Sequence, residues 1–464
     1  MTDWNNAKVL VLGLGDTGLS MTRWLARRGA RVAVADSRAE PPHAKAVRAE
    51  LPDVSIAAGG FDRALFEGID AIAISPGIDP REKPIAEAKA RGVAMIGDVE
   101  LFASALARVT SDRGAARPKV IAITGSNGKS TVTAMGGSAC RAAGLATVVA
   151  GNIGLPVLDA IADIEAGAAL PGVFVLELSS FQLETTATLD PDAATVLNVT
   201  EDHLDRYDGM DDYAAAKARI FQGGGVQVLN REDARTLAMA RPGREVVTFG
   251  ADAPHGDREW GIAGDALRHG ERVLLGIDEL PVAGLHNAVN ALAALALGSA
   301  VGIDPSRMAP GLRTYQGLPH RLEKVAQIRG VTFYDDSKGT NVGATVAALK
   351  GMTTPVVLIA GGDGKGQDFS PLAPAVADKA RAVVLIGRDG PRIEAELKGG
   401  QAPLIRADTF EQAVDRAYGA AQPGDAVLLS PACASYDMFR SYVHRGQVFV
   451  ELVQALAARE RAKP

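Results

Sequence analysis

A glycine-rich stretch with a lysine and two hydroxyl side chains is the first feature of the sequence that suggests chemistry. It reads GSNGKST, spans residues 125–131, and follows the apolar run 120–124. An apolar strand, such a loop and a helix in this order are typical of phosphate-binding loops, because backbone N–H groups can approach phosphate oxygens. Lys129 would add positive charge, and the Ser130 hydroxyl could ligate magnesium. The standard loop has glycine where Ile123 stands, but we still favour a nucleoside triphosphate site over a chance glycine turn.

Acidic side chains follow two further apolar runs, at residues 173–178 and 194–199. Glu177 lies at the end of the first run. The second run is followed by Glu201, Asp202, His203 and Asp205. The carboxyl ends of parallel strands meet at one edge of a sheet, and magnesium prefers oxygen ligands. The sequence therefore predicts a magnesium–nucleotide site at this edge.

A second glycine motif, GLGDTG at residues 13–18, follows the apolar run 9–12. Asp36 ends the next apolar run, at about the distance expected of a ribose-binding acid. Read alone, this motif indicates a dinucleotide site, and an NAD-dependent dehydrogenase is one alternative. That reading leaves residues 125–131 unexplained, and the rest of the chain shows no obvious catalytic histidine or lysine constellation for hydride transfer.

These motifs must be positioned by the elements around them. Short valine- and isoleucine-rich runs alternate with helix-compatible stretches along the whole chain, a pattern that predicts parallel sheets covered by helices. Residues 107–119 lose apolar periodicity and are expected to form a linker. We predict an α/β protein of three domains: a Rossmann-like domain over residues 1–108, a central P-loop ATPase-type domain with a mostly parallel sheet over 109–318, and a Rossmann-like domain over 319–464.

Bulk properties narrow the class of protein. The chain has 464 residues and a formal net charge of −6 at pH 7, so we expect no nucleic-acid partner. It has neither a signal-peptide pattern nor a run of ~20 apolar residues, which predicts a cytoplasmic protein without membrane insertion. A monomer is expected. Cys140 and Cys433 are far apart in the sequence and are predicted to be buried thiols.

The chain resembles the Mur ligases of peptidoglycan precursor synthesis, most closely the branch that adds D-glutamate. The resemblance covers essentially the whole chain and rests on motifs in order: TGSNGKST, GNIG, ELSSFQLE, NVTEDHLDRY, HNAVNALAA, GLPHR, DDSKGTN, GGDGKGQDF and LLSPACASYDMF. It implies an ATP-dependent ligase that joins D-glutamate to UDP-N-acetylmuramoyl-L-alanine through an acyl phosphate. ATP and magnesium, with two ions expected, would be required.

The resemblance also assigns residues around ATP. The implied ATP-binding residues are Gly125, Ser126, Asn127, Gly128, Lys129, Ser130, Thr131, His286, Asn287, Asn290, Arg321 and Asp336. The implied metal ligands are Ser130, Glu177, His203 and Lys217, the last as a carbamate. The implied catalytic residues are Lys129, Glu177, His203, Lys217 and Asn152. From spacing alone, Lys217 would be a solvated helix lysine and Asn287 a helix cap.

The resemblance also implies which residues bind the two other substrates. The implied contacts to the UDP substrate are Asp16, Thr17, Asp36, Ser37, Arg38, Gly77 and Asn152. The implied contacts to D-glutamate are Lys338, Thr340, Lys365, Ser435 and Tyr442. Three residues depart from the pattern: Asp16 stands where an apolar residue is usual, Gly339 replaces alanine, and Tyr442 replaces phenylalanine.

Three alternatives stay open at this point. The dehydrogenase is one, and a non-catalytic nucleotide-binding regulator is another. The regulator would not require the predicted magnesium ligands. Within the ligases, folate polyglutamylating enzymes and other amino-acid-adding Mur enzymes share the ATP chemistry. The nucleotide-sugar-type first domain favours an early step of muropeptide synthesis.

Overall fold

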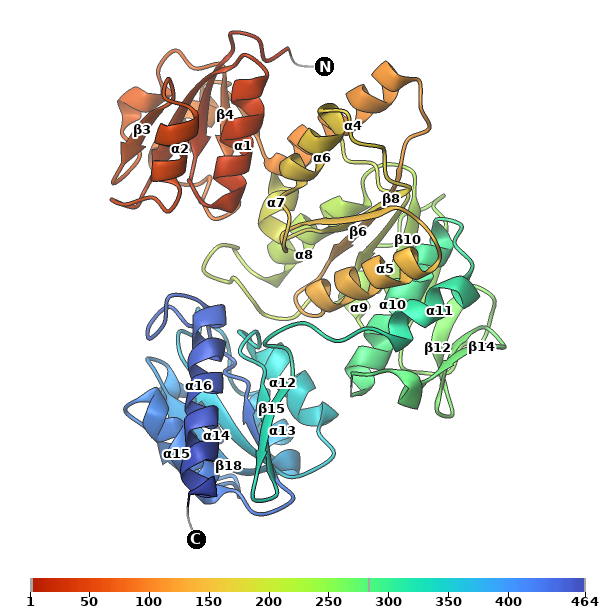
Figure 1. Cartoon of the computed structure of the whole chain (residues 1–464), viewed down its shortest axis with the longest axis vertical. Coiled ribbons are helices and arrows are strands. Elements are labelled where there is room, and N and C mark those ends of the chain that lie inside the picture. The colour runs from red at the N-terminus through yellow and green to blue at the C-terminus, as the bar shows by residue number, and fades with distance from the viewer. Residues whose placement is uncertain (1–2, 283, 463–464) are drawn as a thin grey trace.

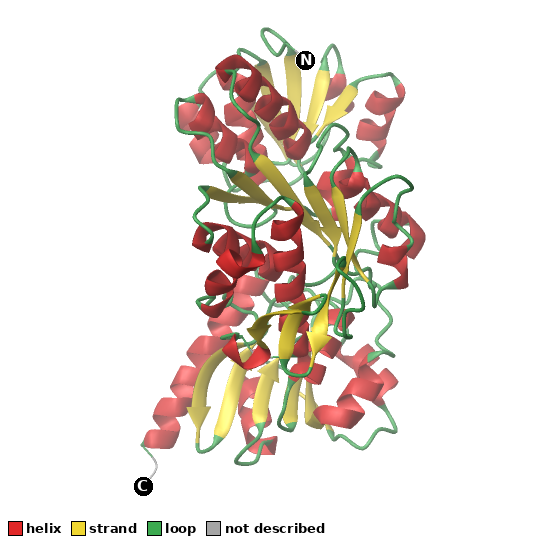
Figure 2. Cartoon of the chain, turned by 90° about the vertical axis from the view of Figure 1, so that its right-hand side faces the viewer, coloured by secondary structure: helices red, strands yellow, loops and turns green. Residues whose placement is uncertain are grey.

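The computed structural model describes residues 3–282 and 284–462. The strands of these residues form three sheets, which follow one another along the long axis of the molecule (Figures 1 and 2). Each sheet is mostly parallel and is covered by helices, which confirms the predicted α/β class. Among the described residues, no helix is long and apolar enough to cross a membrane.

The N-terminal sheet has the order β3-β2-β1-β4-β5, and its pairs are parallel. Its strands are β1 (Lys8–Leu12), β2 (Arg31–Asp36), β3 (Ser55–Ala58), β4 (Ala71–Ile74) and β5 (Ala94–Ile96). Its helices are α1 (Asp16–Arg27), α2 (Ala44–Glu50) and α3 (Lys83–Ala90), with the 3-10 turn η1 (Arg63–Phe66). The central strand β1 is apolar at consecutive positions because both faces of the sheet are covered.

The middle sheet has the order β14-β13-β12-β11-β10-β9-β6-β8-β7. Its strands are β6 (Lys119–Thr124), β7 (Thr147–Gly151), β8 (Val173–Glu177), β9 (Ala193–Val196), β10 (Val226–Asn230), β11 (Val246–Phe249), β12 (Glu259–Ala263), β13 (Ala266–His269) and β14 (Arg272–Gly276). The last three strands include antiparallel pairs that the sequence reading missed. They extend the sheet away from β6, which carries the phosphate loop.

Helices of the middle unit cover both faces of this sheet. They are α4 (Asp98–Arg113), α5 (Lys129–Ala142), α6 (Val157–Glu165), α7 (Ser180–Glu184), α8 (Met210–Ala218), α9 (Ala234–Leu237), α10 (Leu285–Ala300) and α11 (Pro305–Arg313), with η2 (Arg219–Phe221) and η3 (Ile277–Glu279). The helix α5 packs against α10 and α11. This packing fixes the start of α5, where the phosphate loop ends.

The C-terminal sheet has the order β15-β16-β20-β17-β18-β19, and only the β15–β16 pair is antiparallel among the described residues. Its strands are β15 (Glu323–Ile328), β16 (Val331–Asp335), β17 (Val356–Gly361), β18 (Ala380–Ile386), β19 (Leu404–Arg406) and β20 (Ala426–Leu429). Its helices are α12 (Val342–Gly351), α13 (Leu372–Lys379), α14 (Gly390–Leu397), α15 (Phe410–Ala420) and α16 (Tyr442–Arg461).

The linker predicted at residues 107–119 is largely wrong. The helix α4 continues to Arg113 and ends at Gly114, whose φ of 56° lies in the left-handed region that favours glycine. The helical pattern is hard to see in the sequence because, of residues 107–113, only Val109 and Thr110 are buried. The predicted boundaries at residues 108/109 and 318/319 stay predictions, and the first falls inside α4.

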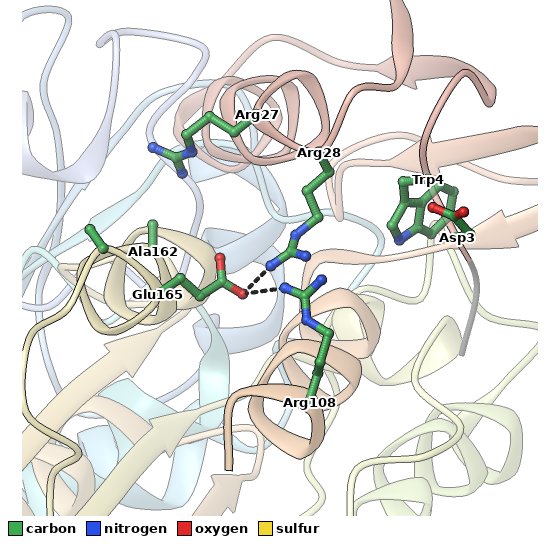
Figure 3. Close-up of a pocket in the computed structure, with 8 residues that line it drawn as sticks. Asp3, Trp4, Arg27, Arg28, Arg108, Ala162 and Glu165 are labelled. Atoms are coloured by element: carbon green, nitrogen blue, oxygen red, sulfur yellow. Dashed lines mark hydrogen bonds and ion pairs between the residues drawn. The ribbon is translucent and has the colours of Figure 1, made fainter. Parts of the chain in front are cut away.

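The N-terminal and middle units meet along α1, α4 and α6. Across this joint the Ser20 hydroxyl donates to Asp159 at 2.7 Å, and Arg28 binds Glu165, which Arg108 of the middle unit also binds (Figure 3). A cavity of about 620 Å³ lies beside this carboxylate. The contacts fix the first sheet relative to the middle one.

Both cysteines are buried and unpaired, as predicted. Burial raises the pKa of the Cys140 thiol to about 11 and that of Cys433 to about 12. Because the thiolate is the reactive form of cysteine, neither residue is suited to nucleophilic chemistry at neutral pH.

Candidate nucleotide and substrate site

The phosphate loop joins β6 to α5 and contains two glycines with a positive φ. Gly125 has a φ of 154° and Gly128 a φ of 83°. The φ of Gly128 favours glycine, and a Cβ there would lie 2.8 Å from the Asn290 side-chain oxygen, which would have to move. The loop is anchored to the segment after β9, because the Asn198 carbonyl and side-chain oxygens accept from its backbone N–H groups at 2.9 and 2.8 Å.

Two lysine ammonium groups converge on one carbonyl of this loop. Lys129 Nζ donates to the Gly125 oxygen at 2.8 Å, and Lys217 Nζ donates to the same oxygen at 2.9 Å. Burial lowers the pKa of Lys129, with Glu177 and Asp202 opposing the shift. The pair places concentrated positive charge at the mouth of the loop, where phosphate oxygens would lie.

Lys217 is 1% exposed, so the solvated-lysine interpretation is wrong. Its Nζ also lies 4.3 Å from the centroid of the Tyr213 ring. Burial, followed by repulsion from Lys129, lowers the pKa of Lys217 well below its ordinary value. This shift favours the neutral amine form of the Lys217 side chain, at the end of α8.

Glu177 and Asn152 lie together at the ends of β8 and β7. The Asn152 amide donates to Glu177 Oε1 at 2.9 Å, and the Asn152 backbone N–H donates to the Glu177 carbonyl at 2.8 Å. Within the described part of the chain, Glu177 Oε2 is buried without a hydrogen-bond partner. A buried carboxylate oxygen left in this state fits a cation ligand, since an unpaired buried charge is otherwise costly.

His203 and Asp202 occupy the loop after β9. The backbone of His203 is left-handed, with a φ of 57°. Burial lowers the pKa of His203 to about 4 despite the neighbouring Asp202 carboxylate, so the imidazole is neutral at pH 7 and retains a nitrogen lone pair. Asp202 accepts from Lys365 and, at 3.3 Å, from Asn341, both of the C-terminal unit.

A cavity of about 140 Å³ lies beside the phosphate loop, between the middle and C-terminal units. Its lining includes these predicted ATP-binding residues: Asn127, Gly128, Thr131, His286, Asn287, Asn290, Arg321 and Asp336. It also includes Gly339, noted above as a departure from the family pattern, and residues that the sequence did not indicate: Asn198, Leu322, Ala344, Ala347 and Ala348. The alanines belong to α12, and their small apolar side chains gave no signal in the sequence.

The N-terminal end of α10 supplies three of the lining residues. Gly284 is the N-cap of this helix, so Asn287 lies inside the helix and the capping interpretation is wrong. The Asn290 amide lies 3.4 Å from the Asn287 side-chain oxygen. Burial, with a further contribution from Arg321, lowers the pKa of His286 to about 4, so this ring is neutral at pH 7.

The first residues of the C-terminal unit reach back to the phosphate loop. Arg321 donates to the Ser130 hydroxyl oxygen at 3.1 Å. The preceding residue, His320, pairs with buried Asp335 at 2.7 Å and has a φ of 61°. The next acid, Asp336, accepts from the Ser430 hydroxyl at 2.7 Å, and burial raises its pKa to about 7 despite this bond. Contacts across the boundary thus complete the cavity.

The predicted D-glutamate residues all lie in the C-terminal unit, four of them on loops and Tyr442 at the start of α16. Lys338 Nζ lies 3.8 Å from the centroid of the Tyr442 ring, and burial lowers the Lys338 pKa to about 8. Lys365 instead pairs with Asp202 of the middle unit. Thr340 donates its backbone N–H to the Lys338 carbonyl at 2.8 Å, and Ser435 is 2% exposed beside the Asp363–Ala434 bridge.

Apart from Asn152, the predicted UDP-substrate residues lie at the carboxyl ends of β1, β2 and β4. Burial opposes ionisation of Asp36, yet hydrogen bonds from Arg38 and from the Leu14 N–H lower its pKa to about 2. Thr17, Ser37 and Gly77 are at least partly exposed at this edge. The side chain of Asp16 is 85% exposed and pairs with His43 at 2.7 Å, so it is engaged outside the glycine turn.

Asn341 is a site residue that the sequence reading missed as an individual residue. Its side chain caps α12 by accepting from Ala344 at 2.8 Å, and its amide donates to Asn127 of the phosphate loop at 3.0 Å. Its only sequence signal was its position in the DDSKGTN motif. The contact to Asn127 depends on how two units meet, which local sequence does not specify.

Comparison with known families matches three successive parts of the chain. Residues 7–97 match the MurD-like N-terminal domain of Mur ligases, residues 123–298 the Mur ligase middle domain, and residues 320–433 the Mur ligase glutamate ligase domain. In fold, the chain is similar to the UDP-N-acetylmuramate–alanine ligase of Thermotoga maritima, with a TM-score of 0.61, 19% identity, and coverage of 97% of this chain and 99% of that one.

Two curated relatives are much closer in sequence. A UDP-N-acetylmuramoylalanine–D-glutamate ligase of Thiobacillus denitrificans is 60% identical over 458 residues, which cover 97% of each chain. The protein of the same name from Aromatoleum aromaticum is 56% identical over 455 residues, again 97% of each chain. With three matched domains in order and such identity over nearly its whole length, the chain belongs to the Mur ligase family.

Proposed function

We propose that the protein is the ATP-dependent ligase that joins D-glutamate to UDP-N-acetylmuramoyl-L-alanine in peptidoglycan precursor synthesis. The observation that carries this proposal is the convergence of Lys129 and Lys217 on the phosphate loop, beside the unpaired oxygen of Glu177. The names of relatives at 60% and 56% identity support the choice of substrates. Hydride transfer by a dehydrogenase does not require two lysines at a phosphate loop beside an unpaired carboxylate oxygen.

The reaction requires two displacements. A carboxylate oxygen of the L-alanine residue attacks the terminal phosphorus of ATP, an acyl phosphate forms, and ADP leaves. The D-glutamate nitrogen then attacks the acyl carbon, inorganic phosphate leaves, and the nitrogen loses a proton. Both steps spread negative charge over oxygens, so cations held in place and correct alignment supply most of the acceleration.

The phosphate-binding part is assigned to residues 125–131. The backbone N–H groups of the loop that do not donate to Asn198, together with the Lys129 side chain, would hold the outer phosphates, while Arg321 approaches the same region from the C-terminal unit. His286, Asn287 and Asn290 would border the nucleoside. Asp336 would contact the nucleotide from the C-terminal side.

Magnesium fits the donor set at this edge of the sheet. The proposed holders of two ions are Ser130, Glu177, His203 and Lys217, the last after its amine has taken up carbon dioxide as a carbamate. The low pKa of Lys217 favours that modification, because only the neutral amine adds to carbon dioxide. When bound, magnesium would neutralise charge on the phosphates and the transferring group.

The two other substrates are assigned to opposite ends of the site. Thr17, Asp36, Ser37, Arg38 and Gly77 would bind the UDP group, with Asn152 closer to the reacting carboxylate. Lys338, Thr340, Lys365, Ser435 and Tyr442 would bind D-glutamate, whose two carboxylates require cations and hydroxyls. Asp16 is oriented toward His43, which keeps its charge away from the pyrophosphate.

The C-terminal unit would act as a lid. Its contacts to the middle unit are polar: Asn341 with Asn127, Arg321 with Ser130, and Lys365 with Asp202. Such contacts can open to admit substrates and reform on closure. The enzyme is proposed to act as a monomer, and its UDP-linked substrate supports a cytoplasmic location.

One assay tests this function. The purified protein is incubated with ATP, magnesium and UDP-N-acetylmuramoyl-L-alanine, and phosphate release is compared for D-glutamate, L-glutamate, L-alanine, L-lysine and diaminopimelate. We expect release with D-glutamate at a rate at least ~100-fold above the others, because a site built for two carboxylates of fixed geometry rejects the rest. Thermal stabilisation by NAD alone would instead favour the dehydrogenase.

A further inference from the structure

The loop that carries His203 is held in an unusual backbone conformation. A left-handed non-glycine residue persists only where its surroundings enforce it. Here the backbone N–H groups of Arg206 and Tyr207 both donate to the His203 carbonyl, at 2.9 and 3.3 Å. The position of His203 therefore depends on what holds Arg206 and Tyr207.

The Arg206 side chain is 10% exposed and makes several contacts within the middle unit. It donates to Glu184 Oε2 at 2.8 Å, and Tyr207 occupies the other oxygen of the same carboxylate at 2.7 Å. The Arg206 guanidinium also lies 4.6 Å from the centroid of the Phe181 ring. That ring contacts the His203 imidazole, with centroids 4.7 Å apart at 61°. Arg206 thus supports the histidine through its backbone and through Phe181.

The same arginine reaches the N-terminal unit. Its Nε lies 3.8 Å from the carboxylate of Asp79, which belongs to the turn after β4, two residues beyond Gly77. A second arginine makes a link in the opposite direction. Arg81 of the N-terminal unit pairs with Asp79 at 2.8 Å and donates to the Asp205 carbonyl of the His203 loop at 3.4 Å. Two arginines therefore tie the Gly77 turn to the His203 loop.

We propose that Arg206 is a positioning residue that couples occupancy of the UDP-substrate pocket to the placement of His203. This inference rests on the proposed function, because it uses the substrate assignments of Gly77 and His203. A UDP substrate that orders the Gly77 turn fixes Asp79, and Asp79 fixes the guanidinium between the two units. The His203 loop is then already ordered when the nucleotide binds, so each ligand strengthens the binding of the other.

Arg206 itself is not assigned to any ligand. Its guanidinium contacts Glu184, Asp79 and the Phe181 ring, all of them protein groups. Removal of the side chain should therefore disturb the coupling between the sites more than the affinity of either site alone. A merely structural arginine would lower stability without changing that coupling.

The test compares the affinity of UDP-N-acetylmuramoyl-L-alanine with and without a non-hydrolysable ATP analogue and magnesium, by calorimetry on the full chain. In the wild type we expect the analogue to tighten binding about fivefold or more. In Arg206→Ala we expect less than about twofold tightening, with the affinity in the absence of nucleotide changed by less than about threefold. The kcat for ligation should fall at least tenfold, since displacing a group at the reacting centre by about 1 Å costs that much or more.

Matched variants separate coupling from stability. Arg231→Ala removes another arginine of the middle unit, 15% exposed and paired with Asp252, and should leave the coupling at the wild-type value. Arg206→Lys keeps the charge near Asp79 and Glu184 but loses the planar fork, so an intermediate coupling is expected. Asp79→Asn weakens the junction from the other side and should also reduce the coupling, even if Arg206→Ala fails to fold.

A wild type without coupling, or an Arg206→Ala protein with full coupling and wild-type kcat, would overturn the inference. So would an Asp79→Asn protein with full coupling. Failure of the proposed function has a different signature. A wild type that couples the two ligands but forms no amide with any amino acid would refute the function and leave the role of Arg206 standing.

Discussion

The Nζ of Lys217 lies 2.9 Å from the carbonyl oxygen of Gly125, which also accepts from Lys129 at 2.8 Å. One carbonyl therefore brings together a helix lysine and the phosphate-loop lysine, 88 residues apart in the chain (217 − 129). Burial lowers the pKa of both amines, and the charge of Lys129 lowers the pKa of Lys217 further. The pair is suited to bind added negative charge, whether as phosphate or as a carbamate on Lys217.

Lys129→Ala should abolish ATP-dependent phosphate release. The loop would lose the cation that faces the outer phosphates, and we expect kcat/KM for ATP to fall at least ~1,000-fold, as for loss of a clamp on a transferring phosphoryl group. Calorimetry should show UDP-substrate affinity within about threefold of wild type, because that pocket lies in the N-terminal unit. Exposed Lys89→Ala is the matched control and should behave as wild type. Parental turnover by Lys129→Ala would show the loop assignment to be wrong.

Lys217→Ala should also be inactive, but for a different reason. If the lysine acts as a carbamate, a short-chain carboxylate such as acetate or propionate can occupy the vacated space and restore part of the activity. We expect at least ~10-fold rescue of the residual rate, on the order of one recovered charged contact. The same acids should not rescue Lys129→Ala. Full activity without any added acid would reject a role for this lysine.

Gly339→Ala should weaken nucleotide binding. An ideal Cβ at residue 339 would lie 2.6 Å from the Ser430 hydroxyl oxygen and 2.7 Å from Asp336 Oδ2, both buried. One of these groups must move, which disturbs the hydrogen bond between them. We expect KM for ATP to rise about tenfold, on the scale of one lost hydrogen bond. Gly419→Ala, with open space around its Cβ, is the control and should leave KM unchanged.

Asp336→Asn should alter how stability depends on pH. Burial raises the pKa of Asp336 to about 7, above its ordinary value of 3.8, so between these pH values the folded chain holds a proton that the unfolded chain has released. The free energy of unfolding therefore falls as pH rises from about 4 to about 7, by up to ~1.4 kcal/mol per unit of pKa difference. Asparagine does not titrate, so the variant lacks this pH-dependent part of the free energy of unfolding.

Urea denaturation at several pH values between 4.5 and 7.5 checks this prediction. The variant should lose stability less steeply than wild type over that window, while exposed Asp53→Asn should follow the wild-type slope. Equal slopes for wild type and Asp336→Asn would contradict the assignment of a protonated carboxyl at this site.

Much of the fold follows from buried strands with strong local patterns. The apolar runs at residues 120–124 and 173–178 predicted β6 and β8 closely, because both faces of the middle sheet are covered there. The edge strands β12 to β14 were missed, since short antiparallel strands near a sheet edge carry little apolar signal. The end of α4 was misread as a linker because its last turns are largely solvent-facing.

The site residues also fall into those that local sequence patterns indicate and those that they do not. Local motifs indicated Lys129 and Glu177, since the first follows the buried strand β6 and the second ends the buried strand β8. The left-handed backbone of His203 and the contact of Asn341 with Asn127 had no local signal, because both depend on how separate units pack. The burial of Lys217 was hidden for the same reason: α8 shows no clear apolar face in its sequence, and the burial of that lysine is set by tertiary contacts.

The transfer of phosphate to the substrate carboxylate is tested most directly with oxygen-18. UDP-N-acetylmuramoyl-L-alanine labelled in both carboxylate oxygens is turned over with ATP, magnesium and D-glutamate, and the released phosphate is analysed by mass spectrometry. An acyl phosphate intermediate predicts that one labelled oxygen passes to each phosphate, because the C–O bond of the carboxylate breaks when the amine attacks. Phosphate free of label, released as the amide forms, would contradict the account.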